Sequence, residues 1–173
     1  MIEDHNCFQV FPVLHSQSLV LKEITLKHVD DFSQFAWRNG APIDSKDCPD
    51  LIRANQERYK NKTNINWGIF LDAKLIGAIG FYRGFKNMIG EIGYVLHESY
   101  RKRGVMKEAV ELVLNFGFKE LRLNKIQAFT EQTNLPSVAL LEGFHFENTG
   151  KNTRNIRFMN LLQLLNLVAK GFF

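Results

Sequence analysis

Hydrophobic residues in the first third of the chain recur at two different periods. Leu19–Ile24 alternates closely enough to predict a strand. Between Leu26 and Phe35 the apolar residues are three apart, close to the helical period, and Thr25 stands where a helix N-cap is expected. A second helix is predicted from Leu51 to about Lys60, with Asp50 as its cap. The chain is therefore expected to begin with one strand and two helices.

Strand patterns dominate the middle of the chain. Trp67–Leu71 and Leu75–Phe81 flank a short turn and predict a β-hairpin. Ile89–Leu96 predicts a third strand, in which Gly90 and Gly93 indicate a bulge or a close approach of backbone. This part of the chain is therefore expected to supply three strands of a sheet.

The remaining residues return to alternating helices and strands. A helix is predicted over Val105–Glu120, a strand over Lys125–Thr130 and a short helix over Ser137–Glu142. Phe144–Glu147 and Ile156–Leu162 predict the last two strands, joined through a polar connection. No repeat, low-complexity tract or linker interrupts this order. Residues 1–173 are therefore expected to form a single α+β domain with a mixed sheet.

The composition suits a small globular protein with an anionic ligand. The chain has 173 residues, of which 45% are hydrophobic and 15 are Phe, so it can bury a sizeable core. The formal net charge of +4 favours an anionic small molecule. This charge is too small, and the basic residues too scattered, to argue for nucleic acid, so no nucleic-acid partner is expected.

Cysteines and terminal segments indicate the compartment. Cys7 and Cys48 are far apart in sequence, which favours two free thiols in a reducing compartment. No cysteine or histidine has the spacing of a metal site, so no metal is expected. No stretch reaches the roughly 18 apolar residues of a membrane span, and residues 1–6 do not resemble a signal peptide. We expect a cytoplasmic protein without a membrane partner, whose apolar tail, Leu161–Phe173, makes a homodimer a candidate.

Residues Tyr100–Ala109 combine the features of an anion site. They follow a predicted strand and open a predicted helix, whose first turn offers unpaired backbone N–H groups and a positive dipole end. Arg101 to Arg103 add three positive charges, and Gly104 allows a phosphate to approach the backbone closely. A solvated basic turn is the alternative for this stretch taken alone. With its surroundings, the pattern predicts a pyrophosphate site.

Arg101-Lys-Arg-Gly-Val-Met106 resembles the (Gln/Arg)-x-x-Gly-x-(Gly/Ala) signature with which the GNAT acetyltransferase superfamily binds the pyrophosphate of acetyl-CoA. Other segments are similar to further strands and helices of that family, in its order: Leu19–Ile24, Leu75–Gly80, Glu91–Tyr94 and Asn134–Phe146. The chain looks most like the branch of the ribosomal-protein N-terminal acetyltransferases. The resemblance implies a mostly antiparallel sheet of about seven strands, splayed in the middle and flanked by about four helices.

The resemblance also implies how the co-substrate acetyl-CoA is bound. The pantetheine arm is expected between Ile89–Leu96 and Lys125–Thr130, where Asn134 would hydrogen-bond it, unless Asn134 only caps a helix. The residues expected to bind the co-substrate are Tyr94, Val95 and Leu96 through their backbone, and Arg101, Lys102, Arg103, Gly104, Val105 and Met106 around the pyrophosphate. Met106 departs from the small residue usual in the family, and core packing is its alternative role.

Two side chains are candidates for catalysis by the same resemblance. Glu91 stands where the family often has an acidic residue that takes the proton of the amine, directly or through a water; a surface glutamate is the alternative. Ser137 could stabilise the leaving thiolate, or could simply belong to the first turn of a helix. Many members use a tyrosine at the position of Leu141 for this purpose. His145 stands where the family pattern usually has glycine.

The leading hypothesis is an N-acetyltransferase that moves an acetyl group from acetyl-CoA directly to a primary amine in a ternary complex. The acceptor could be a protein N-terminus or a small amine, such as a polyamine, an amino sugar or an aminoglycoside-like compound. The alternative is a regulatory module that binds acyl-CoA without catalysis, which the departures at Met106, Leu141 and His145 would favour. A nucleic-acid binder would rest on the net charge alone.

Overall fold

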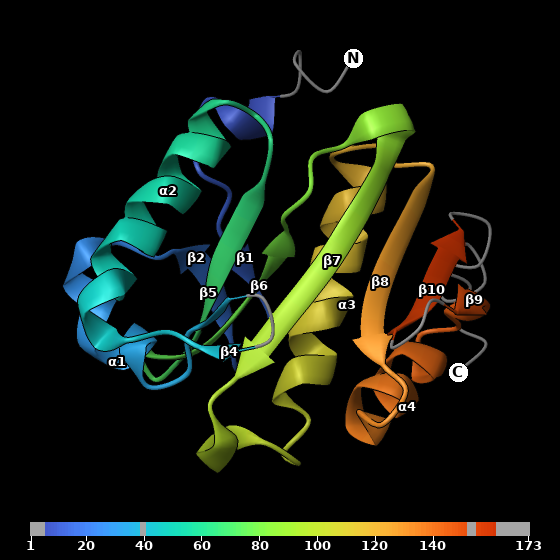
Figure 1. Cartoon of the computed structure of the whole chain (residues 1–173). Helices are drawn as coiled ribbons and strands as arrows, with labels where there is room; N and C mark the ends of the chain where they lie inside the picture. The colour runs from blue at the N-terminus through green and yellow to red at the C-terminus, as the bar shows by residue number, and fades with distance from the viewer. Residues whose placement is uncertain (1–5, 39–40, 152–154, 162–173) are drawn as a thin grey trace.

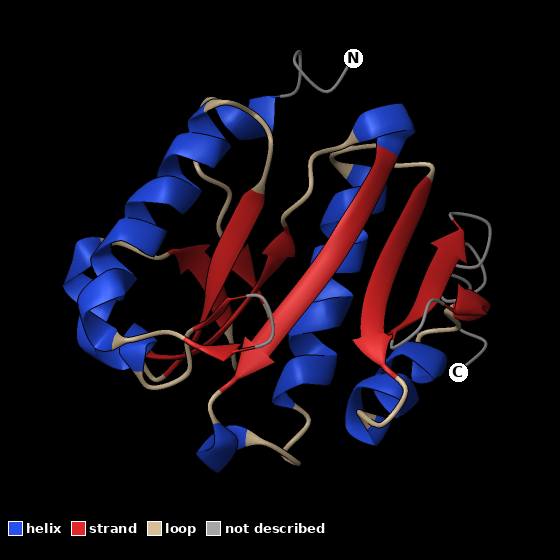
Figure 2. Cartoon of the chain, in the orientation of Figure 1, coloured by secondary structure: helices blue, strands red, loops and turns tan. Residues whose placement is uncertain are grey.

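The computed structural model of the chain describes residues 6–38, 41–151 and 155–161 (Figure 1). Its centre is an eight-stranded sheet in the order β1-β2-β5-β6-β7-β8-β10-β9, and a separate pair joins β3 to β4 (Figure 2). The strands are β1 (Leu14–His15), β2 (Val20–Glu23), β3 (Trp37–Arg38), β4 (Ala41–Pro42), β5 (Ile65–Leu71), β6 (Lys74–Phe81), β7 (Ile89–Leu96), β8 (Lys125–Glu131), β9 (Glu147–Lys151) and β10 (Asn155–Leu161).

Helices cover both faces of this sheet. They are α1 (Val29–Ser33), α2 (Cys48–Lys60), α3 (Val105–Lys119) and α4 (Leu135–Gly143). Figure 1 shows α1 and α2 beside the first half of the sheet, with α3 behind β7. One buried cluster joins α1 and α2 residues to β5 and β6, and includes Phe32, Ile52 and Phe70. The larger cluster joins α3 to the opposite face and includes Val113 and Leu141 of α4.

The sheet splits open between β7 and β8. All other neighbouring strands pair antiparallel, whereas these two run parallel. Their pairing begins at Ile89–Lys125 and ends at Ile92–Ala128, although β7 continues to Leu96 and β8 to Glu131. We call the space between the unpaired halves, Gly93–Leu96 and Phe129–Glu131, the β7–β8 gap. This opening confirms the splayed sheet that the resemblance implied (Figure 1).

Most predicted elements are confirmed, and β7 has the predicted bounds. Two residues, Asp72 and Ala73, form the turn of the β5–β6 hairpin and both have positive φ, as a tight hairpin turn requires. Gly90 and Gly93 lie under side chains rather than at a bulge: a Cβ on Gly93 would lie 2.4 Å from Tyr82 Cε1. Both predicted explanations, a bulge and a close approach of backbone, are therefore wrong, because the atoms that crowd these glycines belong to side chains.

Several predictions differ from the structure. The strand predicted over Phe144–Glu147 is wrong, because α4 extends to Gly143 and β9 begins only at Glu147. Helix α2 begins at Cys48 with Asp47 as N-cap, so Asp50 lies within its first turn. The short strands β1, β3 and β4 were not predicted, since two residues carry no periodicity. The tail from residue 162 onward, on which the dimer prediction rests, lies outside the described residues.

Replacing Gly80 by Ala is expected to destabilise the fold by about 3 kcal/mol. A Cβ there would lie 2.2 Å from Ile65 O and 2.7 Å from Asn66 Cα, so β5 and β6 would have to separate. Gly143→Ala is the matched control, because no heavy atom lies within 4 Å of that Cβ and alanine suits a helix. Urea unfolding of both variants measures the difference; equal midpoints would contradict the close packing at Gly80.

Candidate functional site at the β7–β8 gap

The backbone of β7 turns polar groups toward the gap at every second residue. Glu91 O accepts from Tyr82 N, and His97 N donates to Ile76 O, so the odd-numbered residues of β7 bond to β6. Tyr94 and Leu96 consequently turn their N–H and C=O groups to the other edge, where the ladder with β8 has ended. Tyr94, Val95 and Leu96 were predicted to bind the co-substrate through their backbone. The backbone groups of Tyr94 and Leu96 face the gap.

Val95 is oriented differently from its neighbours. It pairs with Ala78 of β6, and a Cβ on Gly77 would lie 2.6 Å from Val95 O. Its backbone groups therefore point away from the gap, while its side chain packs against the cluster under α1 and α2. Val95 could therefore contact the co-substrate only through its side chain, and not through its backbone.

Glu91 is a buried carboxylate on the α1–α2 face of β7. Its exposed fraction is 5%, because β8 runs beside it in register and Gln127 lies directly opposite. Gln127 Nε2 donates to Glu91 Oε2 at 3.1 Å, and Arg83 Nε lies 3.1 Å from Oε1. Among the described residues, Oε1 has no partner in hydrogen-bond geometry. The carboxylate is thus held in place from both sides, by Gln127 and by Arg83.

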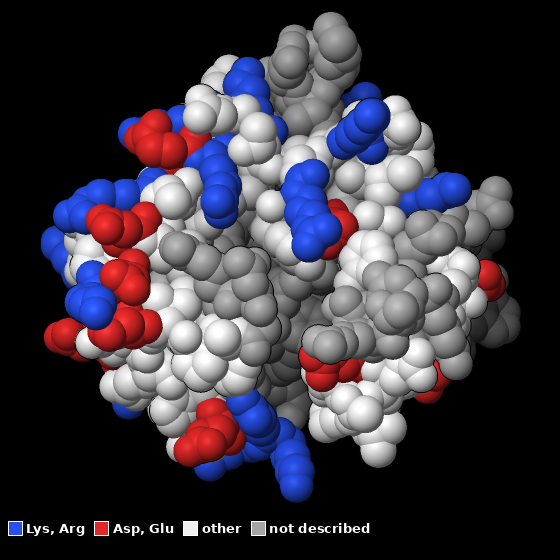
Figure 3. All heavy atoms as spheres, in the orientation of Figure 1, with Lys and Arg blue, Asp and Glu red and all other residues white. Residues whose placement is uncertain are grey.

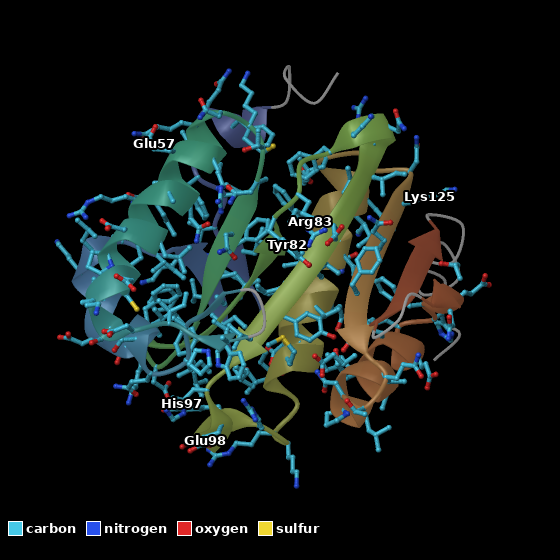
Figure 4. The ribbon with its side chains drawn as sticks, in the orientation of Figure 1. Glu57, Tyr82, Arg83, His97, Glu98 and Lys125 are labelled. Atoms are coloured by element: carbon cyan, nitrogen blue, oxygen red, sulfur yellow. The ribbon has the colours of Figure 1, made fainter. Side chains whose placement is uncertain are left out.

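The loop between β6 and β7 supplies the other side chains around Glu91. Tyr82 and Arg83 lie in front of the middle of β7 (Figure 4). Burial raises the pKa of the Tyr82 phenol, and the charge of Glu91 raises it further. The Tyr82 ring covers Gly93, which explains why this position has no side chain. Arg83, by contrast, is 68% exposed and can move without disturbing the core.

The helix-facing side of the gap holds a pair of hydroxyl groups. Tyr94 Oη lies 2.7 Å from Ser137 Oγ in the first turn of α4. Ser137 N donates to Asn134 O at 3.0 Å and to Asn134 Oδ1 at 3.3 Å. Asn134 is therefore the N-cap of α4, as its alternative role required, and it fixes the backbone that carries Ser137.

The segment from Leu96 to α3 presents positive charge and free amide groups. The first helical bond of α3 runs from Glu108 N to Gly104 O, so the amides of the preceding turn have no helical acceptor. Gly104 has φ +79°, and no heavy atom lies within 4 Å of where its Cβ would be. Figure 3 shows basic side chains protruding at the bottom of the view, where Figure 1 places this segment.

The basic side chains of this segment are exposed but partly fixed. Arg101 Nε donates to Leu96 O at 3.2 Å, which ties the guanidinium to the end of β7. The Arg103 guanidinium lies 5.7 Å from the centroid of the Tyr100 ring. Lys102 has φ +60° and stands at the exposed corner of the turn. A free helix N-terminus with flanking arginines fits a pyrophosphate group.

The three departures from the family pattern have structural explanations. Met106 is half-buried against the main core cluster, as its alternative role required, so its bulk does not fill the anion site. Leu141 is fully buried in the same cluster. His145 has φ +57°, the conformation that normally favours glycine, and remains exposed. None of these residues closes the gap or the helix N-terminus.

Neither cysteine is placed to attack a thioester. Cys48 is the buried first residue of α2, and burial raises the pKa of its thiol. Burial also raises the pKa of the Cys7 thiol, to about 11. The described residues contain no group of three or more His, Cys, Asp or Glu that could hold a metal ion. Within the same residues, no helix is long and apolar enough to cross a membrane.

Residues 18–147 match the sequence model of the Acetyltransferase (GNAT) domain. The chain belongs to the GNAT family. It is 33% identical over 110 residues to the probable N-acetyltransferase YjcK of Bacillus subtilis (strain 168). This match covers 61% of this chain and 61% of YjcK. It is 30% identical over 154 residues to the uncharacterized N-acetyltransferase YoaA of the same organism, covering 82% of this chain and 86% of YoaA.

The fold is that of solved GNAT structures. A structure of RimL, a ribosomal L7/L12 alpha-N-protein acetyltransferase in complex with coenzyme A, superposes with a TM-score of 0.77. The comparison covers 88% of this chain and 99% of that one, at 15% identity. This likeness confirms the predicted α+β fold of the family.

Sequence reasoning named Glu91 and Ser137 but missed their partners. Gln127 is 36 residues from Glu91, and only the parallel register of β7 and β8 brings the two together. Arg83 is nearer in sequence, but its position depends on how the β6–β7 loop closes. For Tyr94 the sequence indicated backbone contacts only, whereas its phenol reaches Ser137. The available signal was weak: a tyrosine in a strand next to the gap.

Replacing Gly104 by Ala is expected to weaken acetyl-CoA binding about fivefold, because a positive φ costs an alanine about 1 kcal/mol. The space around its Cβ is open, so the effect comes from the backbone alone. Gly84→Ala is the control, since Gly84 has φ +73° and lies in the β6–β7 loop. Calorimetric titration with acetyl-CoA gives both affinities. Equal affinity of wild type and Gly104→Ala would contradict the role of this turn.

Proposed function

We propose that the protein transfers an acetyl group from acetyl-CoA to a primary amine by direct attack in a ternary complex. The observation that supports this most is the position of Glu91 and of the Tyr94–Ser137 pair on opposite faces of β7, next to the same gap. A thioester in the gap would have a proton acceptor on one face and hydroxyl donors on the other. The helix N-terminus with Arg101 and Arg103 lies at the end of the same strand.

Each residue then has one task. Glu91 accepts the proton that the amine loses as its nitrogen bonds to the acetyl carbon, directly or through a water. The electron pair of the broken C–S bond stays on the CoA sulfur, where a hydrogen bond from Ser137 would stabilise it. The gap-facing backbone groups of Tyr94 and Leu96 would hold the pantetheine arm. Residues 101–106 would hold the pyrophosphate, through charge and through the amides of α3.

The ion pair of Arg83 and Glu91 favours a substrate amine that is uncharged when it binds. A guanidinium 3.1 Å from the carboxylate lowers its attraction for a second cation. At pH 7 about one α-amine in ten is neutral, against fewer than about one lysine amine in a thousand. An α-amine is therefore favoured as acceptor over a lysine or a polyamine, and RimL, which has the same fold, is a protein α-N-acetyltransferase.

The state of the thiols also supports direct transfer. A covalent acetyl-enzyme formed on cysteine needs a thiolate beside the thioester. Cys7 lies in the 3₁₀ turn Asn6–Phe8 and Cys48 lies in α2, neither of which borders the β7–β8 gap, and burial raises the pKa of each thiol. Steady-state kinetics should therefore show intersecting rather than parallel lines when acetyl-CoA is varied at several amine concentrations.

The test is acetylation of a panel of amines by the purified full chain, followed by mass spectrometry. The panel contains peptides with free N-termini, the same peptides with a blocked N-terminus and one lysine, spermidine and an amino sugar. Acetylation of free N-termini only is the expected result. Acetylation of spermidine or the amino sugar alone would assign a small-molecule acceptor. Acetyl-CoA binding without acetylation of any amine would indicate a regulatory module.

A further inference from the structure

A side-chain hydrogen bond links the unpaired end of β7 to α4. Tyr94 belongs to β7, whereas Ser137 belongs to α4, which follows β8 in the chain. Their hydroxyl oxygens are 2.7 Å apart, although the residues are 43 positions apart in sequence. The backbone ladder between β7 and β8 has already ended at Ile92–Ala128. The hydroxyl pair therefore joins the unpaired end of β7 to the helix that follows β8.

Ser137 has one hydroxyl proton, so it cannot donate to Tyr94 and to the sulfur of CoA at the same time. A serine hydroxyl donates once and accepts through its lone pairs. If Ser137 donates to Tyr94, it has no proton left for a negatively charged sulfur. If Tyr94 donates to Ser137, the serine proton is free. Either direction is compatible with the geometry of the pair.

We propose that Tyr94 is a positioning residue that donates to Ser137 Oγ and thereby directs the Ser137 proton toward the leaving sulfur of CoA. This inference rests on the proposed function. The C–N bond forms as the C–S bond breaks, the amine proton goes to Glu91, and the sulfur keeps the electron pair. Tyr94 and Ser137 keep their own protons throughout, and the thiolate takes a proton from solvent after release. The two hydroxyls act as a chain of donors, each strengthening the next.

The surroundings of Tyr94 keep its phenol protonated and pointed in one direction, as a hydrogen-bond donor to Ser137 requires. Its ring packs against the core cluster of α3, which leaves its phenol a fixed direction. Burial raises the pKa of this phenol, and the hydrogen bond to Ser137 offsets part of the change. The group consequently stays protonated at neutral and mildly alkaline pH. On the other side, the bonds of Ser137 N to Asn134 hold the serine backbone still.

The experiment compares Tyr94→Phe, Ser137→Ala and the double variant in steady-state acetylation of a free N-terminal peptide. Tyr94→Phe keeps the ring and loses only the hydroxyl. We expect its kcat to fall about fivefold to tenfold, with the affinity for acetyl-CoA unchanged. The double variant is expected to be no slower than Ser137→Ala, because Tyr94 acts through Ser137.

Tyr59→Phe is the matched control. Tyr59 is also a partly buried tyrosine, and its hydroxyl donates to Cys7 O at 2.8 Å, away from the gap. It should lose similar stability in thermal unfolding without change in kcat. An unchanged kcat in Tyr94→Phe would overturn the inference, and so would effects of Tyr94→Phe and Ser137→Ala on kcat that multiply in the double variant. In either case, an active wild type would still support the proposed function. A wild type that acetylates no amine would overturn both.

Discussion

Glu91→Gln is expected to lower kcat for acetyl transfer about 100-fold or more while leaving acetyl-CoA affinity unchanged. Glutamine has the shape of glutamate and can keep a hydrogen bond with Gln127, so the β7–β8 pairing should persist. What it loses is the ability to take a proton from the attacking amine, and general bases typically contribute about 10²–10⁴-fold. Initial rates at saturating acetyl-CoA and peptide, with a parallel calorimetric titration, separate the chemical step from binding.

A matched change on α2 controls for loss of charge. Glu57 is 62% exposed and pairs with Lys60, and Figure 4 shows it on α2, away from β7. Glu57→Gln removes the same charge and should leave kcat within about twofold of wild type. If Glu91→Gln retained full activity, Glu91 would not be the base. The buried carboxylate would then serve only to position Arg83.

The double variant Arg101→Ala/Arg103→Ala is expected to bind acetyl-CoA about 100-fold more weakly. Both arginines belong to the turn that leads into the N-terminus of α3, and bonds from charged donors contribute about 1.5–3 kcal/mol each before solvent screening. Arg101 also donates to Leu96 O at the end of β7, so removing the Arg101 side chain leaves this carbonyl group without that partner. The affinity of the wild type should fall with added salt more steeply than that of the variant.

Arg53→Ala/Arg58→Ala is the corresponding control. These arginines lie on α2, where Arg53 pairs with Asp50 and Arg58 with Asn55. The change in net charge is the same in both double variants. Equal loss of affinity in the two would show that acetyl-CoA responds to total charge rather than to a defined site, and would refute the assignment of residues 101–106.

The elements that sequence predicts well are those whose pattern is local. Strand β7 and helix α3 are long, and their ends are marked by turn residues or glycine. The short helix α1 is less regular: a 3₁₀ turn at Leu26–His28 precedes it, and Leu26 stays 45% exposed. Strand β9 escapes prediction because Glu147–Lys151 is polar, and it forms only through its pairing with β10.

The candidate site is predictable only as far as its motifs reach along the chain. The anion site lies within a single continuous segment, so its residue types and spacing suffice to indicate it. The partners of Glu91 and Ser137 come from other elements, at separations of 36 and 43 positions in the sequence. Such contacts depend on strand register and on where a parallel ladder ends. A one-residue shift of β8 would turn Gln127 to the other face.

The central claim is that acetyl-CoA occupies the β7–β8 gap along the free edge of β7. Residue-resolved amide hydrogen exchange by NMR, with and without acetyl-CoA, tests it directly. The amides of Tyr94 and Leu96 face the gap beyond the last pair with β8, whereas Val95 is paired with β6. We predict that acetyl-CoA slows exchange at Tyr94 and Leu96 and in the first turn of α3, with a much smaller change at Val95. Saturating acetyl-CoA that leaves Tyr94 and Leu96 exchanging as in the free protein would contradict the account.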